Sequence, residues 1–249
     1  MLNLLKIEWK KVNLKGYSIV FLAILAFACI SVVVTGYMYT DESTRELVAQ
    51  MGVIGDAGQN VYGTFFSSIS GTIYQFMFIF CGIFGGEIFL KEYKNGTIKT
   101  LFTSPVKREK IIASKVIFYV ILNFIFTLIF VVVQLAVLMV VSKIFVIEGS
   151  PVTFELIKEF LPQICLNIVG VSIAVLLPLS IVLIKSKTEG MLIGICVAAI
   201  VLFSAVTSSV TLFKSSETIL NVFYVMLPLL GLLSMGWYTK KYINKDVIA

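Results

Sequence analysis

Six stretches without a single charged side chain dominate this sequence: 16–40, 57–86, 116–142, 160–184, 190–213 and 218–239. Each is at least 22 residues long, and a helix that crosses the roughly 30 Å hydrocarbon core of a bilayer needs about 20 apolar residues. Only helices and closed barrels satisfy the backbone in lipid, and these continuous runs lack the alternation of a barrel strand. The sequence therefore predicts an all-α membrane protein with six transmembrane helices.

We expect the spans at about 17–39, 66–90, 116–142, 161–184, 190–210 and 218–239, within one transmembrane domain covering residues 1–249. The chain is 59% hydrophobic and 14% charged, whereas soluble domains average about 45–50% and about 25%. The first charge-free run is longer than the apolar core of a signal peptide, and no A-x-A-like site closes it. We therefore interpret it as a retained span.

The basic residues predict the orientation. Lys and Arg number 16 in residues 1–15, 91–115, 185–189 and beyond 239, but only 4 in the segments between them. The positive-inside rule then places both termini and residues 91–115 in the cytoplasm. The net charge of +6 is thus mostly a topology signal, and it leaves no basic folded face for nucleic acid.

Residues 1–15, MLNLLKIEWKKVNLK, repeat apolar side chains at helical spacing and fill the other positions with Lys. The apolar stripe consists of Leu2, Leu5, Trp9 and Val12. This pattern predicts an amphipathic helix that lies on the membrane, with Trp9 at headgroup depth and the Lys side chains toward the lipid headgroups. The alternative is a charged tail that only fixes topology.

Several kinds of chemistry are missing from the sequence. It contains no His, and its four Cys all lie inside the charge-free runs, so we expect no metal site and no catalytic residues. No Walker A sequence is present to cradle a nucleotide phosphate. The spans also lack the mid-membrane ionisable groups that ion-coupled carriers and pumps keep. If this protein moves a substrate uphill, a partner must supply the energy.

The amide side chains within the predicted spans include Asn123, Gln134 and Asn167. Such side chains commonly form hydrogen bonds between transmembrane helices. They are also the residues that could line a translocation path, and the sequence leaves both roles open.

The cytoplasmic segment 91–115 is far more polar than the predicted spans on either side of it. A solvated loop explains its Lys and Arg, but not the apolar side chains Ile98, Leu101 and Phe102. A short helix from about residue 98 to 104, ended ahead of Pro105, would present all three on one side. Apolar side chains exposed to the cytosol favour a protein partner.

The order Glu92-x-x-x-Gly96-Thr97, Leu101, Pro105-Val106-x-Arg108, Ile111-Ile112 and Lys115 resembles the signature after the second span in permease subunits of type-2 ABC exporters. The resemblance implies that residues 91–115 carry a cytoplasmic coupling helix between spans two and three, seated in a groove of a separately encoded ATPase. The implied ATPase-coupling residues are Glu92, Gly96, Thr97, Ile98, Leu101, Phe102, Pro105, Val106 and Arg108.

The same resemblance implies a second inner contact at Lys185, Lys187 and Glu189. It further implies two ATPase subunits, which would bind ATP and Mg²⁺ in place of this chain, and a second permease in a homo- or heterodimer.

Within that family, a chain of this size without an external domain resembles the bacterial plasma-membrane permeases of bacitracin and lantibiotic self-protection and of amphipathic-peptide export. An exporter of polysaccharide or small drugs is the alternative within the family. Two other classes stay open: a non-transporting membrane scaffold or sensor, and a secondary carrier, which would need transport driven by an ion gradient without ATP.

Overall fold

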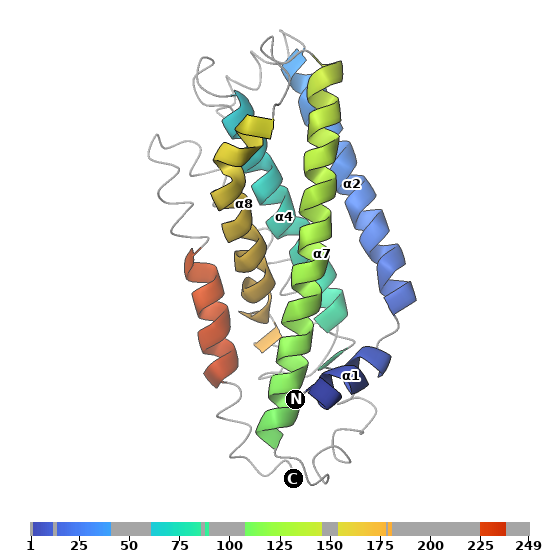
Figure 1. Ribbon diagram of the computed structural model, residues 1–249, viewed down its shortest axis with the longest axis vertical. Coiled ribbons are helices and arrows are strands. Elements are labelled where there is room, and N and C mark those ends of the chain that lie inside the picture. The colour runs from blue at the N-terminus through green and yellow to red at the C-terminus, as the bar shows by residue number, and fades with distance from the viewer. Residues whose placement is uncertain are drawn as a thin grey trace.

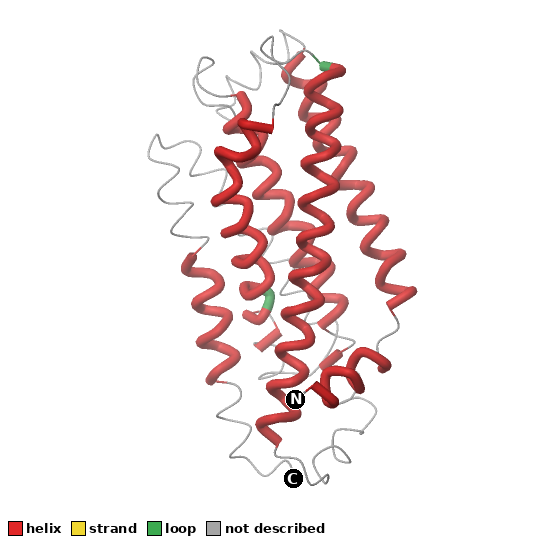
Figure 2. Tube along the Cα trace, in the orientation of Figure 1, coloured by secondary structure: helices red, strands yellow, loops and turns green. Residues whose placement is uncertain are grey.

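The computed structural model describes residues 2–11, 14–40, 61–85, 88–89, 108–145, 154–177, 179–180 and 225–237. Every element in these ranges is helical (Figure 2), which confirms the all-α prediction for this part of the chain. The helices are α1 (Leu2–Lys11), α2 (Leu14–Thr40), α4 (Val61–Gly85), α7 (Arg108–Ile144) and α8 (Phe154–Ala174), followed by the helix Val225–Trp237.

The long helices form one bundle, and α1 lies across the end of the bundle at which α7 begins (Figure 1). Helices α2 and α7 run in the same direction, since Phe21 packs against Phe126 and, further along both helices, Gly36 meets Val141. The helix Val225–Trp237 meets the end of α8, where Gly231 lies against the backbone of Ile173 and Ala174. Just beyond α8, the Ser180 hydroxyl donates a hydrogen bond to the Ser234 hydroxyl at 2.8 Å.

Two helices in the described ranges are long and apolar enough to cross a membrane. Their apolar segments are Lys15–Tyr37 and Lys110–Ile144. The most apolar windows of these segments are only 22% and 33% buried inside the protein, whereas the core helix of a soluble protein would be mostly buried. Their outward apolar side chains therefore suit lipid. Shorter apolar helices are Gly71–Gly85, Phe160–Ala174 and Val225–Trp237.

The predicted spans compare with these helices as follows. The spans 17–39 and 116–142 lie within α2 and α7, and the spans 66–90, 161–184 and 218–239 overlap α4, α8 and the helix Val225–Trp237. The span 190–210 lies outside the described residues, so the count of six stays a prediction. Residues 108–115, expected within the coupling segment, form the first two turns of α7.

An aromatic core joins α2, α4 and α7. The ring centroids of Phe21 lie 5.4 Å from Phe80 and 4.8 Å from Phe126, and the Phe80 and Phe126 rings are also 4.8 Å apart. Closer to the start of α7, Phe84 stacks on Tyr119 at 6.1 Å. Tilted and edge-to-face contacts at these distances stabilise by about 0.5–1.5 kcal/mol per pair beyond the burial of area.

Candidate functional site: the inner end of α7 and the intramembrane amides

The predicted coupling residues lie next to, but mostly outside, the described part of the chain. Glu92, Gly96, Thr97, Ile98, Leu101, Phe102, Pro105 and Val106 fall outside it, as do Lys185, Lys187 and Glu189 of the second inner contact. Arg108, the last of the predicted coupling residues, is the first residue of α7. The structure therefore describes the helix that continues directly from the coupling segment into the membrane.

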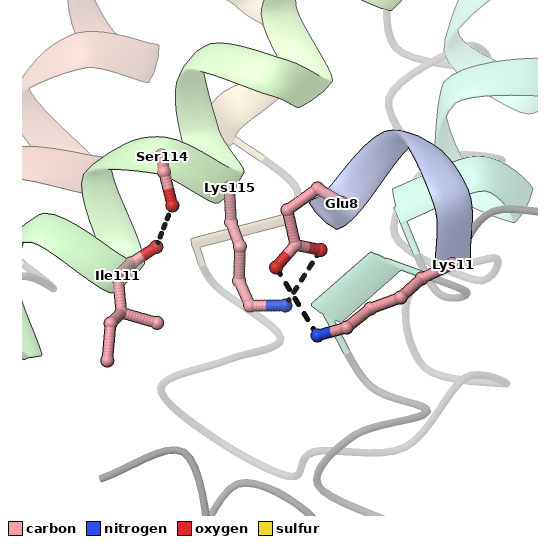
Figure 3. A network of polar contacts seen from close by, with 5 residues as sticks. All are labelled: Glu8, Lys11, Ile111, Ser114 and Lys115. Atoms are coloured by element: carbon pink, nitrogen blue, oxygen red, sulfur yellow. Dashed lines mark hydrogen bonds and ion pairs between the residues drawn. The ribbon is translucent and has the colours of Figure 1, made fainter. Parts of the chain in front are cut away.

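A buried ion pair joins the N-terminal part of α7 to α1. The Lys115 Nζ lies 3.3 Å from Glu8 Oε2, and each side chain is only 8% exposed. The Lys11 Nζ lies 3.6 Å from Glu8 Oε1, with its side chain 42% exposed. Figure 3 shows both ammonium groups directed at the one carboxylate. Glu8 thus connects two segments that are 107 residues apart in sequence.

Apolar contacts reinforce this junction. The Trp9 ring meets the Phe118 ring edge-on, with centroids 6.1 Å apart, and Leu5 packs against the hydrophobic core. Ile111, one turn before Lys115, is buried, and its carbonyl oxygen accepts a hydrogen bond from the Ser114 hydroxyl at 2.8 Å (Figure 3). Thus α1 is held by an ion pair, an aromatic contact and a Leu side chain together.

The helix predicted at the N-terminus is present, and its contacts with the bundle include a residue outside the predicted apolar stripe. Glu8 is the most buried side chain described in α1, whereas Trp9 is half exposed. The reason is that Lys115 offers the carboxylate a partner on the bundle. No sequence pattern singles out Glu8 as a contact, although it is the single acidic residue among the Lys residues of this helix.

Asn123 lies at a polar contact between α4 and α7. The Cys81 thiol donates to the Asn123 Oδ1 at 2.9 Å, the Tyr119 hydroxyl donates to the Cys81 carbonyl oxygen at 2.8 Å, and the Thr127 hydroxyl donates to the Asn123 carbonyl oxygen at 2.7 Å. The amide of Asn123 therefore forms the interhelical hydrogen bond that a structural role predicts. Its Nδ2 has no hydrogen-bond partner within the described ranges.

Gln134 lies eleven residues further along the same face of α7 and is fully buried. Neither its Nε2 nor its Oε1 has a hydrogen-bond partner in the described part of the chain. A buried, unsatisfied amide costs about 1–3 kcal/mol, so a purely structural role explains Gln134 poorly. Asn167 on α8 is also fully buried. The three amides are thus all buried inside the bundle, and their part in a translocation path stays a prediction.

The described residues contain no group of three or more His, Cys, Asp and Glu side chains that could hold a metal ion. Their arrangement is that of a helical membrane protein: long apolar helices, outward apolar faces, internal amides and a basic surface helix fixed to one end of the bundle.

Residues 4–205 match the model of the ABC-2 family transporter proteins. This match covers most of the chain, and the chain belongs to that family. The resemblance noted from the coupling segment is thereby confirmed at the level of an ABC-2-type permease. No curated protein and no solved structure matches the chain.

Proposed function

We propose that this chain is the membrane-spanning subunit of an ATP-driven exporter in the bacterial plasma membrane, with both termini in the cytoplasm. Two such permeases, identical or different, form the translocation path, and two separate ATPase subunits bind and hydrolyse ATP with Mg²⁺. The observation that carries the proposal is the family match over residues 4–205, which includes the whole coupling segment. The absence of a Walker A sequence agrees with an energy source on another chain.

The coupling segment transmits the ATPase movement in this proposal. Ile98, Leu101 and Phe102 enter a groove of the ATPase, and α7 carries the displacement into the membrane because it begins at Arg108. The buried pair of Glu8 and Lys115 supports this role, because it fixes α7 two turns after Arg108, the last of the predicted coupling residues.

The proposal is tested by copurification and transport with the partner ATPase. Leu101→Asp and Phe102→Asp each place a charge in the groove, where an unpaired charge costs several kcal/mol, so ATPase binding and transport are both lost while the protein still inserts. Thr100→Asp, on the opposite side of the expected short helix, is the matched control and keeps both. Undiminished binding and transport in the two apolar-to-Asp variants would reduce the segment to a solvated loop.

The cargo that we propose is an amphipathic or lipid-embedded peptide of the peptide-antibiotic type. The bundle offers a few buried amides, Asn123, Gln134 and Asn167, among many Phe, Val, Leu and Ile side chains. Such a path suits an apolar face together with a few backbone groups, whereas a hydrophilic cargo would need a more polar conduit.

Deletion of the gene tests this choice of cargo. We expect increased sensitivity to cationic amphipathic peptides and increased cellular retention of them, both restored by the wild-type gene. Unchanged sensitivity and retention across a broad peptide panel, together with loss of a surface glycan, would instead identify a polysaccharide exporter. Reproducible absence of any copurifying ATPase would favour a scaffold or sensor.

A further inference from the structure

The surface of α1 is more basic than its sequence suggests. Its ten residues contain one acidic side chain, Glu8, and three Lys. Glu8 is buried between Lys115 and Lys11, so its charge is neutralised within the protein. Lys6, Lys10 and the nearby Lys15 are exposed, and none of them forms an ion pair within the described ranges. The accessible charge of this helix is therefore positive throughout.

The depth of α1 relative to the bundle follows from its two contacts on α7. Glu8 binds Lys115, whereas Trp9 packs on Phe118, which lies three residues, or about 4.5 Å, further along α7 into the bundle. The Trp9 side of α1 therefore faces the apolar region, and half of the Trp9 surface stays exposed. An indole at the boundary between apolar and polar surroundings is typical of the headgroup region.

The start of α2 extends this surface toward the acyl chains. Lys15 lies at the inner end of α2, and Ile19 and Leu22, on the next two turns, are 69% and 60% exposed. Positive side chains thus border a strongly exposed apolar surface. A phospholipid with an anionic headgroup has the complementary order of charge and apolar chain, whereas an acidic protein surface would match the Lys side chains alone.

We propose that Lys6, Lys10 and Lys15, together with Trp9, form a docking surface that binds anionic phospholipids in preference to zwitterionic ones. This surface is called the α1 basic face. Lys ammonium groups attract anionic headgroups through charge, and the burial of Glu8 removes the one acidic group that would repel them. The inference does not depend on an ATPase partner or on a cargo.

The chain offers a direct probe, because it contains two Trp residues, Trp9 and Trp237. Trp237→Phe leaves Trp9 as the sole Trp. This variant is reconstituted into vesicles of three parts phosphatidylcholine to one part phosphatidylglycerol, with brominated chains on one lipid or the other. Bromine quenches indole fluorescence on contact, so quenching per mole fraction of each brominated lipid reports which lipid touches Trp9.

We expect brominated phosphatidylglycerol to quench Trp9 about two- to fivefold more, per mole fraction, than brominated phosphatidylcholine. Lys6→Gln with Lys10→Gln, both at exposed positions, abolishes that excess. The matched control removes two exposed Lys at the opposite end of the bundle, by Lys143→Gln with Lys158→Gln, and leaves the excess unchanged. High salt reduces the excess, because exposed charges are screened.

Equal quenching by the two lipids, or an excess that survives replacement of Lys6 and Lys10, would overturn the proposal. Quenching by neither lipid in a complex with a copurified ATPase would also overturn it, and would identify the α1 basic face as a protein-docking surface. The measurement requires neither transport nor ATP hydrolysis, so its failure is distinguishable from failure of the exporter function.

Discussion

The ion pair between Glu8 and Lys115 makes a quantitative prediction about how firmly α1 is held to α7. At 3.3 Å the Coulomb attraction is about 5 kcal/mol for an effective dielectric constant of about 20. Desolvation offsets part of it, and breaking a buried pair by removing one partner costs about 3–5 kcal/mol. In Lys115→Met, Lys11 still neutralises Glu8 across 3.6 Å. We therefore expect Lys115→Met to lower the free energy of unfolding by about 2–3 kcal/mol.

A double-mutant cycle isolates the pair from the packing around it. The free energy of unfolding is measured by titration with SDS in mixed micelles for Lys115→Met, Glu8→Gln and the double variant. The double variant leaves neither charge of the pair buried, so it should be more stable than the sum of the single losses predicts, by about 2 kcal/mol. The matched control is Lys11→Met, which removes the more exposed cation from the same carboxylate and should cost less than about 1 kcal/mol.

Two results would refute this reasoning. The first is that the losses of the two single variants sum to the loss of the double variant within about 0.5 kcal/mol, which would mean that the two charges do not stabilise each other. The second is a loss in Lys11→Met as large as the loss in Lys115→Met. Either result would leave apolar contacts such as Trp9 on Phe118 as the main attachment of α1.

Three further predictions follow from the packing and the topology. A Cβ at Gly231 would lie 2.9 Å from the Ile173 carbonyl oxygen, whereas one at Gly236 meets nothing within 4 Å. In thermal unfolding, Gly231→Ala should therefore lower the free energy of unfolding by about 1–3 kcal/mol, and Gly236→Ala should not lower it. Because the Gln134 amide is buried and unsatisfied, Gln134→Leu should raise stability by about 1–3 kcal/mol while it lowers transport; a gain in stability with full transport would exclude Gln134 from the path. In a background without native Cys, a Cys at position 107 should be labelled only from the cytoplasm and one at position 46 only from outside, and external labelling at 107 would contradict the topology.

The long apolar helices were predictable because lipid imposes a length and a composition that a single sequence displays. The predicted spans 17–39 and 116–142 fall inside α2 and α7 for that reason. The inner end of α7 was not predictable in the same way. Charged residues mark the edge of a span, but Lys, Arg and Glu are good helix formers, so α7 starts at Arg108, well before the charge-free run.

The contacts at the candidate site depended on pairings that no local pattern contains. Glu8 and Lys115 are 107 residues apart, and the sequence indicates only that each interrupts its surroundings: an acid among Lys residues, and a Lys at the edge of a span. The position of Asn123 in a predicted span indicates a hydrogen bond between helices, but nothing in the sequence identifies Cys81 as its partner. A thiol is both a small apolar side chain and a weak donor, so composition alone does not separate the two roles.

The length of α7 has a mechanical consequence. Its 37 residues extend about 55 Å, well beyond the roughly 30 Å of hydrocarbon that a span must cross. Lys115, where α1 is attached, lies near the inner end, and Ile144 lies about 43 Å away along the axis. A rigid tilt of about 5° around that attachment moves the outer end of the helix sideways by about 4 Å. In the proposed function, the contact with Glu8 is thus the pivot of α7: a short part of the helix extends from it toward the predicted coupling residues, and a long part extends away through the bundle.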